Sequence, residues 1–352
     1  MQVFDHPDFD NHEKVIFCTD KATGLEAIVA IHSTALGPAA GGCRMFPYNS
    51  QADALTDVLR LSKGMTYKCA VAGLPLGGGK AVIIADANRP DKPDLLKAFS
   101  KHVQSLAGQY WTAIDVGVGP EDADTLAQQC DYVFARASQY EAGFNPSNFT
   151  ALGGFIGVQA VARHVWGREE LAGLRVAIQG LGATGAQLAE HLHKAGAKLV
   201  VADINAEAVK QICQRFGAEA VEPETIHAAA VDVFAPCAMG AVVNDKTVAE
   251  IKAKAVCGLA NNQLAMPAHG NELKKRGIAY VPDYVVNAGG MMGASTVIFD
   301  TPSREKSLER IHGLYDTILL ILKESDTTGK SSADVADGLA KSRIAAHTTS
   351  SR

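Results

Sequence analysis

The sequence predicts an α/β protein of two domains, and three observations support this prediction. The chain has 352 residues, whereas single hydrophobic cores stop growing at roughly 250 to 300 residues. Strand-like apolar runs alternate with helical runs over residues 1–140. A strand, a glycine-rich turn, a helix and a second strand then follow one another over residues 174–205. The Gly-, Pro- and Asn-containing segment 139–148 reads as the linker between the domains.

Composition and charge exclude several classes of protein. The chain is 47% apolar and 20% charged, which is typical of a globular enzyme. Its net charge of −5 argues against nucleic acid as the main partner, because such binding relies on clustered cations. No apolar run approaches the roughly 18 residues that a membrane helix needs. The acidic, polar start MQVFDHPDFDNHEKV is unlike a secretory signal peptide.

Cysteine and histidine usage predicts a cytoplasmic protein without a metal site. The seven cysteines are odd in number and scattered, and they form no Cys-x-x-Cys pair, so we expect reduced thiols. The histidines provide no His-Glu-x-x-His arrangement.

The first domain contains three strand-like runs, at residues 25–33, 80–86 and 109–116. Between the first two, residues 51–72 place Leu55, Leu59, Ser62 or Lys63, and Met65 at helical spacing, which predicts an amphipathic helix.

The segment that begins the second domain carries a dinucleotide-binding pattern. Gly180, Gly182 and Gly185 match G-x-G-x-x-G between a strand and a helix, so the chain can turn sharply, approach a pyrophosphate and pack the helix closely. Asp203 ends the next strand, where it can accept hydrogen bonds from both ribose hydroxyls and would repel the 2′-phosphate of NADP. The order of these elements predicts a Rossmann domain that binds NAD.

The rest of the chain continues the α/β pattern. Further segments lie at 231–239, 254–264 and 278–292. Residues 305–323 predict one long amphipathic helix that returns to the first domain, and residues 332–347 predict a short helix.

The stretch AGLPLGGGKAV, residues 72–82, suggests a phosphate loop without matching one. Gly73 lies one residue too far from Gly79, and Ala81 replaces the Ser or Thr that would follow the lysine. An alternative hypothesis is that Gly77 to Gly79 keep side chains away, so that a substrate can reach Lys80.

Two lysines and a carboxylate of the first domain suit an α-amino acid substrate. Lys68 lies near a helix end, Lys80 follows the triple glycine, and Asp115 lies near a strand end. One lysine would bind the substrate carboxylate, and the carboxylate would take protons from the amine. A lysine acts as a base only where burial and a second cation lower its pKa. Both lysines could equally be surface residues, as most lysines are.

Nine blocks, in order, resemble the leucine and phenylalanine dehydrogenase branch of the Glu/Leu/Phe/Val dehydrogenase family. They are LGPAAGGCR (36–44), SKGMTYK (62–68), LPLGGGKAVI (74–83), WTAIDVG (111–117), TALGGF (150–155), QGLGATG (179–185), APCAMG (235–240), ANNQL (260–264) and PDYVVNAGG (282–290). The resemblance covers nearly the whole chain. It implies a mixed-sheet substrate-binding and oligomerisation domain (1–140 with 325–352) and an NAD-binding domain (141–325), with a cleft between them.

The resemblance also implies roles for individual residues. Lys80 and Asp115 match the catalytic residues, Lys68 matches the lysine that binds the substrate carboxylate, and Gly42 matches a backbone N–H in the same pocket. The remaining substrate contacts would be Asn261, Ala40, Met65, Ala113, Met291 and Ala294. The cofactor contacts would be Thr150, Gly180, Leu181, Gly182, Ala183, Thr184, Gly185, Ala186, Asp203, Pro236, Cys237, Ala260 and Asn261.

The implied activity is reversible NAD-dependent oxidative deamination of an apolar L-amino acid to its 2-oxo acid and ammonia. Members of the branch are homo-oligomers, so we expect a dimer or an octamer. Ala40 and Ala294 should enlarge the side-chain pocket and Met291 can flex, whereas Ala113 resembles the leucine type. A branched-chain substrate is the leading prediction, an aromatic one the alternative, and a non-catalytic NAD-binding sensor a third.

Overall fold

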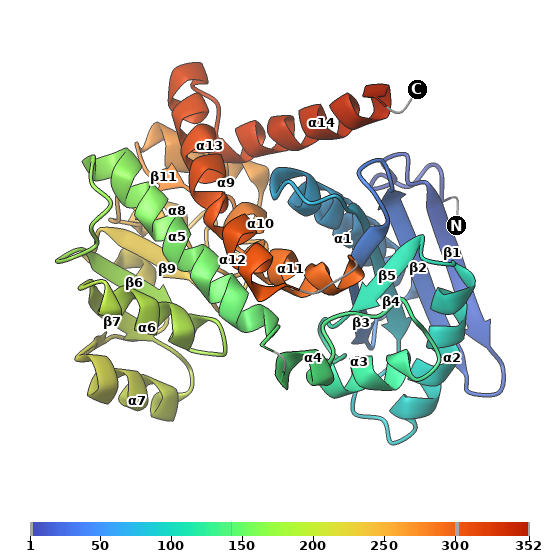
Figure 1. Cartoon of the computed structure of the whole chain (residues 1–352). Helices are drawn as coiled ribbons and strands as arrows, with labels where there is room; N and C mark the ends of the chain where they lie inside the picture. Colours follow the sequence, from blue (N-terminus) through green and yellow to red (C-terminus); the bar gives the residue numbers. More distant parts are fainter. Residues whose placement is uncertain (1–2, 142, 300–302, 351–352) are drawn as a thin grey trace. The chain divides into compact units, whose positions relative to one another are not determined.

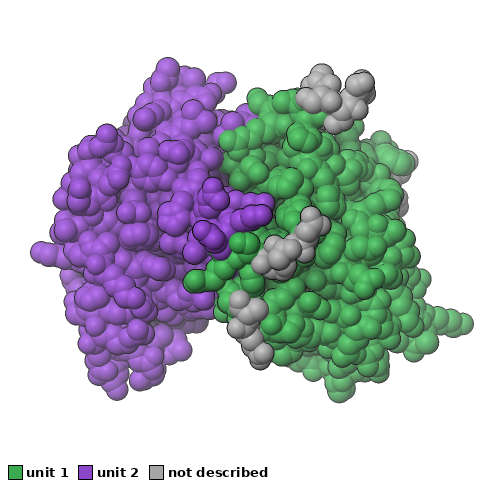
Figure 2. Space-filling model, viewed as in Figure 1, with its two compact units in different colours: residues 1–145, 294–304, 340–352 green, residues 146–293, 305–339 purple. Residues whose placement is uncertain are grey.

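The computed structural model describes residues 3–141, 143–299 and 303–350 and contains two compact units. Figure 2 colours unit 1, which comprises Met1–Asn145, Ala294–Arg304 and Ala340–Arg352, and unit 2, which comprises Pro146–Gly293 and Glu305–Leu339. These units differ from the predicted domains in residues 141–145, 294–304 and 325–339. The predicted ranges also include residues 1, 2, 142, 300–302, 351 and 352, which lie outside the described residues. The cleft and the division into substrate-binding and NAD-binding domains stay predictions.

Unit 1 contains a mixed five-stranded sheet, as predicted, in the order β1-β2-β4-β3-β5. Its strands are β1 (Lys14–Asp20), β2 (Leu25–Ser33), β3 (Ala39–Phe46), β4 (Gly77–Ile84) and β5 (Tyr110–Ala113). The pairs β1/β2 and β2/β4 are antiparallel, whereas β3 runs parallel to both β4 and β5.

Helices cover both faces of this sheet, because its strands carry apolar side chains on both sides. Helix α1 (Gln51–Val71) packs Leu55, Val58 and Leu59 against Ile28 and Val82. On the other face, α2 (Lys92–Ser105) and α3 (Pro120–Ala127) enclose the larger core of unit 1. The short helix α4 (Ala137–Glu141) follows.

Unit 2 has the Rossmann fold that the glycine motif predicts. Its six parallel strands lie in the order β11-β10-β9-β6-β7-β8, so β7 and β8 extend the sheet on one side of β6, and the strand order then reverses because β9 to β11 extend it on the other side. They are β6 (Arg175–Gln179), β7 (Lys198–Ala202), β8 (Glu219–Ala220), β9 (Val233–Pro236), β10 (Ala255–Val256) and β11 (Ala279–Tyr280). Ligands of such sheets bind beyond the carboxyl ends of the strands at this reversal.

The helices that follow unit 2's strands, with α5 before them, are drawn in Figure 1. They are α5 (Pro146–Trp166), α6 (Gly185–Lys194), α7 (Ala206–Phe216), α8 (Thr247–Glu250), α9 (Pro267–Lys275), α10 (Asp283–Val286), α11 (Gly289–Ala294), α12 (Arg304–His312), α13 (Leu314–Thr328) and α14 (Ser332–Ser350). No helix within the described part of the chain is long and apolar enough to cross a membrane.

The long helix predicted for residues 305–323 is two helices. Gly313 separates α12 from α13, and glycine is among the residues that weaken a helix most. Helix α13 packs along α5 in unit 2 rather than returning to the first domain (Figure 1).

Candidate active site

A buried ion pair joins Lys80 to Asp115 in unit 1. Lys80 lies within β4, and Asp115 follows β5 by two residues. Their side chains are only 8% and 14% exposed, and the Lys80 ammonium contacts Asp115 Oδ2. The Val116 N–H donates to Asp115 Oδ1 at 2.5 Å, and backbone hydrogen bonds between Asp115 and Val118 close a tight turn. The carboxylate is therefore held in one orientation.

The surroundings of Asp115 favour its ionised form. Burial alone would raise the pKa of this carboxyl group, but the positive charges of Lys80 and Arg44 outweigh burial and lower the pKa below its ordinary value. Asp115 is thus an anion throughout the neutral and alkaline range. A carboxylate in this state can accept a proton from a substrate ammonium group.

The triple glycine lies inside β4 rather than before it, and its role differs from the hypothesis drawn from the sequence. A Cβ at Gly77 would overlap the Ser33 carbonyl, one at Gly78 the backbone of Thr66, and one at Gly79 the Tyr110 ring. Protein atoms, not open space for a substrate, fill all three positions. Gly78 lets α1 lie directly on β4, and this contact fixes the level at which α1 presents its residues above Lys80.

The predicted substrate residues of β3 and β5 share a sheet face with Lys80. Ala40 pairs with Gly78, and Gly42 pairs with Ala113, so small residues surround the ion pair on the face that α1 covers. A Cβ at Gly42 would overlap the carbonyl of Ile114, so glycine is required at this position.

The predicted substrate residues Lys68 and Met65 come from α1. Lys68 lies in its last turn, and the Met65 Cγ would be 3.0 Å from a Cβ at Gly41. The structure therefore brings together the substrate residues predicted in β3, β4 and β5, with Met65 of α1 beside them. Met291 and Ala294 lie on α11.

The predicted cofactor residues of unit 2 gather at the carboxyl ends of its parallel strands. The glycine turn follows β6 directly, Asp203 follows β7, Pro236 ends β9, and Asn261 comes five residues after β10. This edge of the sheet is where a dinucleotide binds in the Rossmann fold.

The glycine turn fits a dinucleotide. Gly180 has φ +98°, and a Cβ there would lie 2.7 Å from Ala238, while a Cβ at Gly185 would overlap the carbonyl of Gly180. Nothing lies within 4 Å of a Cβ at Gly182, which leaves room for a phosphate group. Asp203 Oδ2 accepts the Leu181 N–H at 2.5 Å, so its carboxylate is fixed beside the turn.

A second contact set surrounds Asn261. Asn287 Nδ2 donates to Asn261 Oδ1 at 2.8 Å, which orients the Asn261 amide with its NH₂ group still able to donate. Asn287 Oδ1 is buried and has no hydrogen-bond partner among the described residues, so it can accept from a ligand. The Thr150 hydroxyl donates to the Pro146 carbonyl at 2.8 Å.

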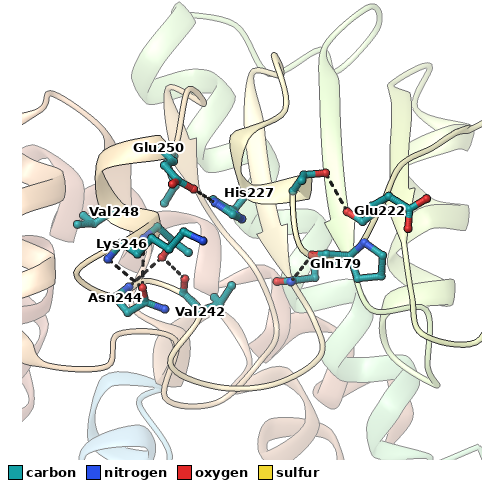
Figure 3. Close-up of polar contacts among 12 residues, drawn as sticks. Gln179, Glu222, His227, Val242, Asn244, Lys246, Val248 and Glu250 are labelled. Atoms are coloured by element: carbon teal, nitrogen blue, oxygen red, sulfur yellow. Dashed lines mark hydrogen bonds and ion pairs between the residues drawn. The ribbon is translucent and has the colours of Figure 1, made fainter.

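Polar contacts outside the predicted site hold the loops of unit 2 (Figure 3). Gln179 donates to the Pro223 carbonyl at 3.3 Å, and buried His227 pairs with Glu250 at 2.6 Å. Asn244 Oδ1 accepts the N–H groups of Lys246 and Thr247, both at 3.1 Å. These contacts fix the segments on either side of β9, whose end carries Pro236.

Sequence reasoning missed Arg44. It bridges Asp57 and Asp115, which lie 13 and 71 residues away in the chain. The one available signal was a charged residue within the otherwise uncharged stretch AAGGCRMF.

The chain matches known dehydrogenases along most of its length. Residues 12–132 match the family described as Glu/Leu/Phe/Val dehydrogenase, dimerisation domain, and residues 203–300 match Glutamate/Leucine/Phenylalanine/Valine dehydrogenase. A leucine dehydrogenase of Bacillus cereus is 44% identical, covering 98% of this chain and 94% of its own. A phenylalanine dehydrogenase of Caldalkalibacillus thermarum is 42% identical, with coverages of 95% and 91%. The solved L-tryptophan dehydrogenase from Nostoc punctiforme is 41% identical, with a TM-score of 0.85 and coverages of 96% and 97%.

Proposed function

We propose, since the chain belongs to the Glu/Leu/Phe/Val dehydrogenase family, that it converts an apolar L-amino acid to its 2-oxo acid and ammonia with NAD as the oxidant. It is an amino acid dehydrogenase, an oxidoreductase that acts on the CH–NH₂ group. The observation that carries the proposed site is the buried Lys80–Asp115 ion pair, surrounded by small residues of β3 and β5.

NAD, when bound, supplies the acceptor for the hydride that leaves the substrate Cα. The turn from Gly180 to Gly185 would hold its diphosphate, and Asp203 would accept hydrogen bonds from its ribose hydroxyls. Asn261, Asn287 and Thr150 offer donors and acceptors for the carboxamide. The carboxylate of Asp203 favours NAD over NADP, because a 2′-phosphate there would meet a like charge.

The residues of unit 1 would bind the substrate and carry out the proton transfers. Lys68 and the N–H of Gly42 bind the substrate carboxylate, and Asp115 accepts the proton that the substrate ammonium must lose before oxidation. Lys80, in its neutral form, then removes a proton from the water that attacks the imine carbon. The same group returns that proton to the departing ammonia and then takes up the hydroxyl proton as the carbonyl group forms. Burial of Lys80 and Asp115 excludes other water from this exchange.

The residues expected to contact the substrate side chain are apolar, which supports an apolar substrate. Ala40 and Ala113 are almost fully buried and present no charge, and Met65 stands over the same face of the sheet. We propose a branched-chain amino acid as the preferred substrate. The small side chain of Ala40 supports an aromatic amino acid as the second candidate. One methylene group changes discrimination by only about 1 to 3 kcal/mol, so relatives for several side chains are expected.

One panel of substrates tests the reaction. Purified protein is incubated with single L-amino acids and either NAD or NADP at alkaline pH, and reduced nucleotide is measured by absorbance. We expect NADH with leucine, valine or isoleucine and little NADPH. An enzyme that forms no NADH with any branched-chain or aromatic L-amino acid contradicts the proposal.

Lys80→Ala separates an enzyme from an NAD-binding sensor. This variant should lose at least about 100-fold in turnover and still bind NAD, because the cofactor residues lie in unit 2. Lys101→Ala, which removes an exposed lysine of α2, is the matched control and should keep full activity. Turnover that survives in Lys80→Ala would remove Lys80 from the mechanism.

We also propose that the protein is a homo-oligomer in the cytoplasm, with small molecules and copies of itself as its partners. Residues 12–132 match the dimerisation domain of the family, which supports a dimer as the smallest assembly. Light scattering of the purified protein measures the subunit number, and a monomer would contradict this part of the proposal.

A further inference from the structure

Arg44 supplies a second cation to the carboxylate of Asp115. Arg44 pairs with Val82 across β3 and β4, two residues beyond Lys80, so its side chain leaves the same sheet face as that of Lys80. Arg44 Nη2 lies 3.4 Å from Asp115 Oδ1, whereas Lys80 contacts Oδ2. Each oxygen of this buried carboxylate therefore faces a different cation.

The same guanidinium group is shared with a second carboxylate. Arg44 Nη1 lies 2.8 Å from Asp57 Oδ2 on α1, closer than its contact with Asp115. The Tyr48 hydroxyl donates to the same Asp57 oxygen at 2.5 Å. Asp57 thus draws Arg44 partly away from the catalytic carboxylate.

The other titratable groups around this site stay neutral. Burial raises the pKa values of the Cys43 thiol and of the Tyr48 and Tyr110 hydroxyls well above their ordinary values. The charged groups joined by these contacts are then two cations, Arg44 and Lys80, and two carboxylates, Asp57 and Asp115. Lys68 adds a further cation on α1 that the proposed function assigns to the substrate.

Loss of a proton from Lys80 would leave this group of two cations and two carboxylates with one positive charge fewer. Asp115 would then be a buried anion without its main partner, which is strongly unfavourable. A lone Lys80–Asp115 pair would therefore hold the proton on Lys80 and prevent it from acting as a base. Arg44 remains charged at every working pH, so it can keep Asp115 paired after the proton has left.

We propose that Arg44 is a positioning residue that lets Lys80 release its proton while Asp115 stays ionised, and that Asp57 limits how strongly Arg44 does so. This inference rests on the proposed function of Lys80 and Asp115.

Replacement of Arg44 and of Asp57 should have opposite effects on the pH profile. In Arg44→Gln a positive charge is lost, so protons are held more tightly by the Lys80–Asp115 pair. The acid limb of kcat/KM for oxidative deamination should then move to higher pH, by about one unit. In Asp57→Asn a negative charge is lost and Arg44 is released toward Asp115, so the limb should move to lower pH. Arg44→Lys keeps the charge and should restore most of the wild-type profile.

The experiment measures kcat/KM of the full-length variants with the best L-amino acid and saturating NAD, from neutral to strongly alkaline pH. Arg60→Gln is the matched control, because Arg60 is an α1 arginine with a 67% exposed side chain that pairs with Asp8. Its limb should coincide with that of the wild type. Thermal midpoints of all variants, recorded in parallel, identify any that fail to fold, and Asp57→Asn then tests the sign independently of Arg44→Gln.

The outcomes distinguish this inference from the proposed function. If the limbs of Arg44→Gln and Asp57→Asn move in the same direction or stay in place, Arg44 has no such role, even where kcat falls. A merely structural role would lower the rate without opposite shifts and without rescue by Arg44→Lys. An inactive wild type, or an active Lys80→Ala, overturns the proposed function and this inference together.

Discussion

Gly77 and Gly78 of β4 lie against neighbouring backbone, which leaves no room for a Cβ at either position. At Gly78 a Cβ would overlap the backbone nitrogen of Thr66, and a backbone atom cannot move aside as a flexible side chain can. Because Thr66 lies between Met65 and Lys68 on α1, any displacement at Gly78 moves the predicted substrate residues relative to Lys80. A single methyl group at this position therefore changes both packing and chemistry.

Gly78→Ala should lower both stability and turnover. We expect the free energy of unfolding to fall by about 1 to 3 kcal/mol, as for other overpacked sites, and kcat/KM to fall while NAD binding persists. Gly64→Ala on α1, the helix that Gly78 contacts, is the control, because nothing lies within 4 Å of a Cβ at Gly64. This variant should be more stable than the wild type, because a helical Gly→Ala change stabilises by roughly 1 kcal/mol. Denaturant unfolding, NADH formation and NAD titration measure the three quantities. Equal behaviour of the two variants would refute the packing role of Gly78.

At the scale of residues, sequence reasoning found groups in local patterns and missed groups defined by long-range contacts. Asp203 could be singled out from the sequence because a strand, a turn, a helix and a second strand precede it in order. Lys80 and Asp115 were ambiguous from local context, and the family resemblance favoured them. Arg44 carried only the weak signal of one charge in an uncharged stretch, and the role of Asn287 was not predicted, because each is defined by a partner that only the folded chain brings near.

Helix α1 is supported by a pair of buried histidines on the side that faces the N-terminal segment. His32 of β2 lies 2.8 Å from the Thr66 hydroxyl, and His12 lies 3.0 Å from the Ser62 hydroxyl one turn earlier. The two rings pack edge to face with centroids 4.8 Å apart. Two contacts one turn apart fix the rotation of α1, which also carries Lys68.

These histidines should make the protein sensitive to acid. Burial, with a smaller contribution from His12, lowers the pKa of His32 from 6.5 to about 4, so between these values the unfolded chain binds more protons than the folded one. The stability that neutral His32 provides is complete above pH 6.5 and is lost as the pH falls toward 4. The loss should approach about 3 kcal/mol.

Urea unfolding of wild type and His32→Gln across this pH range measures the effect. The variant should be less stable near neutrality and should lose less stability on acidification. His193→Gln, which replaces an exposed histidine of α6, should retain the wild-type slope. Parallel slopes for wild type and His32→Gln would show that His32 does not titrate in this window.

Elements with strong periodicity were predictable, and elements formed by tertiary pairing were not. The helix expected at residues 51–72 is α1, and the run at 25–33 is β2. Strand β3 was not expected, because AAGGCRMF contains two glycines and no regular alternation. It forms because β4 and β5 pair with both of its edges. The break at Gly313 was missed because apolar periodicity continues across it.

Five of the seven thiols of the chain are buried within the two units. Five cysteines are buried, Cys18, Cys43, Cys69 and Cys130 in unit 1 and Cys257 in unit 2, while Cys213 and Cys237 are half-buried and all seven are free. Burial raises the pKa of Cys18 to about 11 and that of Cys237 to about 12, so neither forms the reactive thiolate near neutral pH. Cys213 is half-buried and lies on α7, where Ile212 is the fully buried residue, so we expect Cys213 to be the first cysteine to react.

Thiol titration without reductant therefore tests the integrity of both units at once. Native protein should react rapidly at one cysteine, Cys213→Ser should abolish that fast phase, and protein unfolded in denaturant should react at all seven. Several fast thiols in the native state would mean that a core opens on the timescale of labelling. Fewer than seven after unfolding would reveal a disulfide and contradict the free cysteines. Because the number of reactive thiols includes cysteines of both units, variants with substitutions in either unit can be compared with the wild type by this number. In Gly78→Ala, rapid labelling of Cys69 would show directly that α1 has separated from β4.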